Sequence, residues 1–175
     1  TPSTGQFFAA TTENAVYSLE EKTGAQTWKH NIGGYLVNAP VCGADPKHHG
    51  IVSPPIIDEA SKTIFVAAAM TDGHHEIHAL NTDTGMEVAG WPVDVSKIKA
   101  GNLAFPSNVQ NQRSALSLVN GVVYVAFGGY CGDGGNYHGW VIGVNAADPT
   151  KIGAWATMDN RQAGIWAAGG LASDG

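Results

Sequence analysis

The sequence has little charge and no long apolar run. Charged residues make up only 14% of the chain, against roughly a quarter in an average soluble domain. The nine basic residues are scattered, so no Lys/Arg cluster is available to neutralise phosphates. No apolar stretch reaches the ~18–20 residues that cross a membrane. We therefore expect neither a nucleic-acid partner nor a membrane span.

Helical periodicity and cysteine are also scarce. No segment shows a convincing period of 3.6 residues, which favours an all-β class. Only Cys42 and Cys131 occur, and they lack the C-x-x-C spacing of zinc or redox sites. The two could pair as a disulfide in an exported protein, or they could be separate thiols. Glycine is abundant, at 23 of 175 residues, which indicates many tight turns.

Three segments of the chain are similar to one another, at a spacing of about 60 residues. Each has a short strand rich in β-branched and aromatic residues, a second strand, a turn and an outer strand with a tryptophan. These units cover residues 7–33, 63–95 and 122–157, and further strands at 53–58 and 114–119 precede the last two. A repeating unit of four antiparallel strands is typical of a β-propeller blade.

Two of the units share a motif, in which an apolar-Tyr/His-Ser/Ala-Leu strand is followed by a Thr-Gly turn and a tryptophan. Its copies comprise 16–19, 22–24 and Trp28 in the first unit, and 77–80, 83–85 and Trp91 in the second. This motif resembles the pyrroloquinoline-quinone (PQQ)-type repeat of propellers in the quinoprotein alcohol dehydrogenase-like superfamily. The third unit departs from it, with Asn145–Pro149 in place of the turn. The resemblance implies a secreted or periplasmic protein, and most such repeat proteins have no assigned activity.

We expect residues 1–175 to form a partial ring of about three blades. Blade 1 would cover about 5–33 without its inner strand, blade 2 about 51–95 and blade 3 about 112–157. The inner strand of a further blade would lie at about 164–175. Closed propellers have roughly 4–8 blades. The chain would therefore be a fragment of a longer protein, or else two copies would close one ring as a homodimer.

Ligands of propellers usually bind at the mouth of the central channel, on loops that lead into inner strands. In this chain the aligned loops contain Ser53, Arg113 and Trp166. An arginine beside a tryptophan could hold a carboxylate or a planar quinone. Alternatively, Arg113 caps loop carbonyls and Trp166 fills the channel. We add His138 as a ligand-binding candidate, while its neighbour Trp140 could form a platform or pack between blades.

The resemblance also implies a cofactor set for a working quinoprotein dehydrogenase. PQQ would lie between a tryptophan and a disulfide of adjacent cysteines, with Ca²⁺ held by Glu, Asn and Asp. This sequence has no Cys-Cys pair and no matching trio, so PQQ and Ca²⁺ would be held only if further blades supply the ligands. The histidines at 74, 75 and 78 cannot chelate one metal on a regular strand. We predict exposed turn histidines there, no metal site and no catalytic residue.

The leading hypothesis is an exported propeller that acts as a scaffold. It would bind a small molecule or a protein at the channel mouth. The alternative is a partial catalytic domain of a PQQ-dependent dehydrogenase that oxidises alcohols or sugars.

Overall fold

The structure is a computed structural model that describes residues 5–39, 47–131, 134–158 and 161–174. Within these residues it contains antiparallel strands, one short 3₁₀ turn, η1 (Ser107–Val109), and no α-helix. No helix of this part of the chain is long and apolar enough to cross a membrane. The expected all-β class is confirmed.

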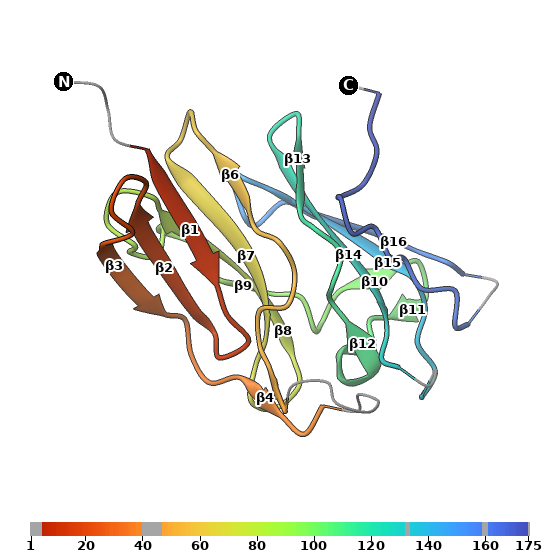
Figure 1. The fold of residues 1–175 in the computed structure, drawn as a ribbon. Coiled ribbons are helices and arrows are strands. Elements are labelled where there is room, and N and C mark those ends of the chain that lie inside the picture. The colour runs from red at the N-terminus through yellow and green to blue at the C-terminus, as the bar shows by residue number, and fades with distance from the viewer. Residues whose placement is uncertain (1–4, 40–46, 132–133, 159–160, 175) are drawn as a thin grey trace.

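Three large sheets stand in a row, with their faces packed against one another (Figure 1). Sheet 1 consists of β1 (Gln6–Ala10), β2 (Ala15–Glu20) and β3 (Gln26–Asn31). Sheet 2 consists of β6 (Ile56–Asp58), β7 (Thr63–Ala69), β8 (His75–Asn81) and β9 (Val93–Asp94). Sheet 3 consists of β13 (Ser117–Val119), β14 (Val122–Gly129), β15 (Trp140–Asn145) and β16 (Ile152–Ala156), with β12 (Gln110–Asn111) paired to the far end of β14.

Two small ladders connect the large sheets. The first pairs β4 (Leu36–Val37) with β5 (His48–His49), and the second pairs β10 (Lys99–Ala100) with β11 (Leu103–Ala104). The sequence repeat predicted neither of these two ladders. Apart from β12, which pairs with β14, the strands of each large sheet are neighbours in chain order, and every large sheet forms from one continuous stretch of chain.

The tight turns follow the sequence signals. Asn120 and Gly121, between β13 and β14, have φ of 51° and 74°, the positive values that a two-residue hairpin turn requires. Gly24 and Gly85 have φ of 70° and 72°, a region that glycine enters without steric cost. In both of these turns the glycine N–H donates to a carbonyl four residues earlier, at 2.8 Å.

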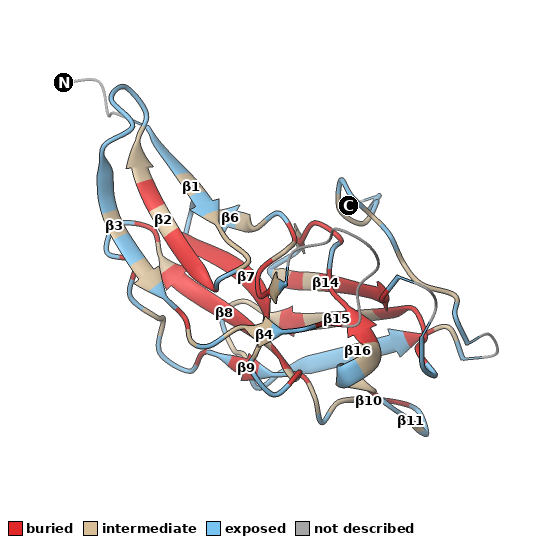
Figure 2. Cartoon of the chain, turned by 60° about the horizontal axis from the view of Figure 1, so that its bottom comes forward, coloured by how far each residue is buried: buried red, intermediate tan, exposed pale blue. Residues whose placement is uncertain are grey.

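The hydrophobic core consists of two clusters, one on each side of sheet 2. Phe65 and Ala67 of β7 pack toward sheet 3, while Ile64 and Val66 pack toward sheet 1. Every residue of β7 is buried, whereas β3 is mostly exposed (Figure 2). Successive side chains of a strand point to opposite faces, so a sheet with neighbours on both sides needs apolar residues at every position.

Two of the expectations concern particular segments. Trp140 is fully buried in the cluster between sheets 2 and 3, so the packing interpretation is confirmed and the platform is wrong. No strand is assigned within 164–174, so the further inner strand expected there stays a prediction. The pairing of Cys42 with Cys131 also stays a prediction, because Cys42 lies outside the described residues.

Candidate functional site

The three loops expected at the channel mouth contact one another. The Leu116 N–H donates to the Pro54 carbonyl at 3.2 Å, which joins the entry to β13 to the loop before β6. The neighbouring Ala115 N–H donates to the Ala167 carbonyl at 3.1 Å. Ser114 strengthens this second link, since its hydroxyl donates to the Ile165 carbonyl and accepts from the Ala167 N–H, both at 3.0 Å. Loops that are far apart in sequence therefore form one surface.

Arg113 lies between two cavities in this surface. The first, of about 470 Å³, has both Ser53 and Arg113 in its wall, together with Ala10, Thr12, Ile51, Val52, Pro54 and Pro55. The second, of about 350 Å³, has both Arg113 and Trp166 in its wall, together with Val52, Pro54, Ser114 and Ala168. We call these two cavities together the Arg113 cleft. Three of the four ligand-binding candidates from the sequence line it.

Arg113 is an exposed residue. No carboxylate among the described residues lies within 4.0 Å of it, although acidic residues outnumber basic ones in the chain, 15 to 9. A guanidinium presents donors in a planar fork that fits a carboxylate with two parallel hydrogen bonds. The cleft therefore offers a positive group to an anion.

Ser53 contributes a buried hydroxyl that makes no hydrogen bond within the described part of the chain. The residue is only 5% exposed. A buried polar group left without a partner costs about 1–3 kcal/mol. A ligand atom or a water molecule in the cavity would remove this cost.

Two glycines, Gly128 and Gly164, leave room for the ring of Trp166 because they have no side chains. A side chain on Gly128 would meet its ring at 2.7 Å, and one on Gly164 would meet its Nε1 at 2.9 Å. The ring therefore lies directly on the backbone at the end of β14. It is nevertheless 53% exposed, and it provides the aromatic wall of the second cavity.

The structure does not bring His138 to the cleft. His138 is buried between β14 and β15, and its Nδ1 donates to the Thr157 carbonyl at 2.8 Å. The side chain of Gln110 fixes its backbone, since Nε2 donates to the His138 carbonyl at 2.8 Å and Oε1 accepts from its N–H at 3.1 Å. His138 lines neither cavity, and its contacts are structural.

The prediction of exposed turn histidines is wrong for His75 and His78, which are 1% and 2% exposed. His75 packs edge-on against Phe127, with ring centroids 5.3 Å apart, and its Nδ1 lies 2.8 Å from the Ser107 hydroxyl. Burial lowers the pKa of His75 to about 3, with smaller contributions from His49 and His74. This histidine is therefore a neutral core residue.

His74 and His78 take part in a row of alternating acids and imidazoles. His74 contacts Asp72 through Nδ1 and Glu76 through Nε2 at 3.2 Å, and His78 contacts Glu76 at 3.2 Å and Glu87 at 2.8 Å. Burial opposes charge on His74, but the hydrogen bonds that its ring donates to the Asp72 and Glu76 carboxylates outweigh burial and raise the pKa of His74. Within the described residues, no group of three or more His, Cys, Asp and Glu is arranged to hold a metal ion.

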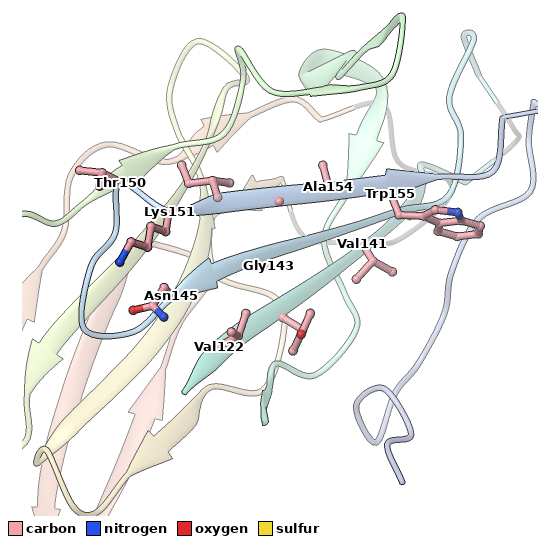
Figure 3. Close-up of a pocket in the computed structure, with 11 residues that line it drawn as sticks. Val122, Val141, Gly143, Asn145, Thr150, Lys151, Ala154 and Trp155 are labelled. Carbon is pink, nitrogen blue, oxygen red and sulfur yellow. The ribbon is translucent and has the colours of Figure 1, made fainter. Parts of the chain in front are cut away.

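Sequence reasoning did not identify a third, larger cavity of about 660 Å³. It lies on the side of sheet 3 that faces away from sheet 2 (Figure 3). The wall is formed by Val122, Tyr124, Val141, Gly143, Asn145, Thr150, Lys151, Ile152, Gly153, Ala154 and Trp155. The continuous apolar runs of β14 and β15 were the available signal, because they place apolar residues on both faces of the sheet.

No family model matches the chain, and no curated protein matches it either. Solved structures do. The quinohemoprotein alcohol dehydrogenase ADHIIG from Pseudomonas putida HK5 has a TM-score of 0.57 at 19% identity, covering 88% of this chain and 19% of that one. A europium-containing methanol dehydrogenase has a TM-score of 0.53 at 20% identity, covering 88% and 23%. BamB from Moraxella catarrhalis has a TM-score of 0.46 at 16% identity, covering 90% and 50%.

The two dehydrogenases are β-propeller proteins, and the chain shares their fold over most of its length. It spans about a fifth of each of them. At this level of identity the similarity extends to the fold alone.

Proposed function

We propose that the chain is a propeller scaffold, exported to the periplasm or beyond the cell, that binds a planar anionic small molecule in the Arg113 cleft. One observation carries this proposal. A guanidinium with no carboxylate beside it and a buried hydroxyl with no partner line the same cavity. Both statements concern the described residues.

Each of the three side chains has a separate role in binding. The guanidinium of Arg113 donates two parallel hydrogen bonds to a carboxylate of the ligand. The hydroxyl of Ser53 makes a further bond and so satisfies its own requirement. Trp166 offers its exposed ring to a flat, conjugated part of the ligand.

The test uses benzoate and benzene-1,2,4-tricarboxylate as probes, with binding followed by calorimetry. Arg113→Gln should weaken binding roughly ten- to a hundredfold, because hydrogen bonds to charged groups contribute about 1.5–3 kcal/mol. The matched control is Arg161→Gln, which removes another exposed arginine that lines no part of the cleft. Equal affinities for the two variants, or no saturable binding by the unaltered chain, would exclude the proposal.

A second candidate is a partial catalytic domain of a PQQ-dependent dehydrogenase acting on alcohols or sugars. Fold similarity to two dehydrogenases, and the arginine and tryptophan in one cavity, favour it. The residues do not fit the whole cofactor set, because the sequence has no adjacent cysteines and the described residues hold no metal-ligand group. Adding PQQ and Ca²⁺ and recording the absorption spectrum tests it. An unchanged cofactor spectrum would remove this candidate.

A further inference from the structure

One side of β8 carries the row of acids and imidazoles described above. We call its members, Asp72, His74, Glu76, His78 and Glu87, the acid–imidazole row. His78 is directly opposite Val66 of β7 and Glu76 is opposite Ala68, so the row lies on the side of sheet 2 that sheet 1 covers. The side chain of His74 is 28% exposed and that of His78 is 3% exposed. One imidazole of the row is therefore within reach of solvent and the other lies in the interior.

Both ring nitrogens of His74 face carboxylates. Nδ1 contacts Asp72, and Nε2 lies 3.2 Å from a Glu76 oxygen. A neutral imidazole has one N–H and one lone pair, so it donates to one of the two carboxylates and turns the lone pair toward the other. With a proton on each nitrogen, the ring donates to both. The arrangement therefore suits a doubly protonated His74.

Glu76 is held from the interior side of the row. Its second oxygen lies 3.2 Å from Nε2 of His78, which is buried and makes no hydrogen bond within the described residues. Nδ1 of His78 lies 2.8 Å from Glu87. The other oxygen of Glu87 accepts from the Ala79 N–H at 2.9 Å. The interior end of the row is thus tied to the backbone of β8, while the His74 end is open to solvent.

The charged groups around the row leave it short of positive charge. Asp94 of β9 is directly opposite Glu76, and Lys97 acts on Asp94 from the following loop. His30 of β3 lies on the side of sheet 1 that covers the row, because Ile32, two positions on, packs there. Within the described residues, the three carboxylates of the row and Asp94 thus outnumber the nearby lysine. A second proton on His74 reduces this excess of negative charge.

His74 also ends the loop between β7 and β8, which joins neighbouring layers of the molecule. The Met70 N–H donates to the His74 carbonyl at 2.8 Å and so closes the loop. Asn14 of sheet 1 reaches the loop, where its Nδ2 lies 3.7 Å from the Met70 sulfur. From another side, the Ser107 hydroxyl of η1 donates to the Gly73 carbonyl at 3.2 Å. A movement of this loop therefore changes the contact between sheets 1 and 2.

We propose that the acid–imidazole row is a proton-operated latch, which holds the β7–β8 loop against sheet 1 while His74 carries two protons and loosens when one is lost. After this loss the Nε2 lone pair faces Glu76, and the ring moves away from that carboxylate while Nδ1 keeps its contact with Asp72. The loop moves with the ring, so its contacts with Asn14 and Ser107 weaken. The latch lies outside the Arg113 cleft and needs no ligand there.

The pKa of His74 gives the direction of the switch. Burial lowers this pKa, but the hydrogen bonds to Asp72 and Glu76 raise it by more, so the net shift from 6.5 is upward. The stabilisation by His74 is therefore fully present below pH 6.5 and is lost as the pH rises through the pKa of the folded state. His75, on the opposite face of β8, has a lowered pKa and loses its contribution below pH 6.5. The two neighbours thus limit the stability of this hairpin from opposite sides of pH 6.5.

Hydrogen exchange of the Met70 amide tests the latch. Its protection factor, the exchange rate of an unfolded amide divided by the observed rate, is measured at pH 6 and pH 9, with a chelator present so that no metal ion replaces the proton. It should fall about tenfold in the unaltered chain, which corresponds to the loss of one hydrogen bond to a charged group.

Two matched variants separate the latch from a general effect of pH. Glu76→Gln offers His74 an amide that can donate to the lone pair of the neutral ring, so its protection factor should fall less than about threefold. Glu59→Gln removes an exposed carboxylate from the turn before β7 and should keep the fall of about tenfold. An equal fall in the two variants overturns the proposal, because the row would then play no part in it.

The ring nitrogen shifts of His74, measured by NMR on the unaltered chain with nitrogen-15 histidine, give a second test that needs no variant. The ring should carry two N–H groups at pH 6 and one at pH 9. A ring with one N–H at pH 6, or with two at pH 9, overturns the proposal. So does a Met70 protection factor that is the same at both pH values.

Discussion

Strand β1, at the edge of sheet 1, and strand β7, inside sheet 2, have similar sequences and very different surroundings. Phe8 and Phe65 occupy the same place in the repeat, yet β1 is largely exposed and β7 is buried along its whole length. Among the described residues, sheet 2 has a neighbouring sheet on each face and sheet 1 has one on a single face. The stability of a strand in this molecule therefore depends on the layers stacked on its sheet, more than on its own β propensity.

The largest expected effect on the free energy of unfolding comes from truncating a side chain in the core between sheets 2 and 3. Phe127 is fully buried between sheets 2 and 3, and its ring centroid lies 4.9 Å from that of Phe105. Phe127→Ala should lower the free energy of unfolding by about 3–5 kcal/mol. Phe7→Ala, on the exposed face of sheet 1, should change it by less than about 0.5 kcal/mol. Urea unfolding of both variants measures the contrast, and similar losses would show that the two faces are equally packed.

Two turn glycines give a closer comparison. Gly24 and Gly85 have nearly the same φ, but only Gly85 lies against a tryptophan ring. Gly24→Ala should cost about 1–2 kcal/mol for the left-handed backbone. Gly85→Ala should cost about 1–3 kcal/mol more, because its methyl group would push Trp28 away from Thr82. Equal costs in thermal unfolding would mean that Trp28 does not hold sheets 1 and 2 together.

The burial of His75 in sheet 2 should make the core sensitive to acid. The pKa of His75 is lowered from 6.5 to about 3, chiefly by burial, so between these values the unfolded chain binds a proton that the folded chain does not. The contribution of His75 to stability is fully present above pH 6.5 and falls by about 1.4 kcal/mol for each pH unit between pH 6.5 and about 3. His75→Phe removes this titration and should flatten the acid side of a stability profile. An unchanged slope would assign acid sensitivity to other groups.

Much of the local structure could be predicted from the sequence. The runs of β-branched and aromatic residues in Thr63–Ala67 and Val122–Phe127 predicted β7 and β14, and Asn120-Gly121 predicted the hairpin turn between β13 and β14. The loops of Ser53, Arg113 and Trp166 could be aligned because the repeat fixes where each loop enters its sheet. These signals are local, or they recur at a constant spacing.

The burial of His75, which contradicts the prediction of an exposed histidine, and the position of His138 both depend on contacts between distant segments. The burial of His75 depends on Phe105 and Phe127, which reach it from the next sheet. His138 is held by Gln110, a residue 28 positions earlier that pattern reasoning had not singled out. Neither contact leaves a trace in the local sequence, because side chains from another layer provide it.

Each large sheet is built from one continuous stretch of chain, and this order has a consequence for synthesis. Closing short hairpins costs little entropy, so a sheet can form soon after its last strand leaves the ribosome. The face that the next sheet will cover stays exposed until that sheet is translated. Trp28, for example, cannot reach Thr82 until β8 has emerged. The nascent protein therefore exposes the apolar face of its most recently formed sheet, and this exposed face moves from sheet to sheet as translation proceeds.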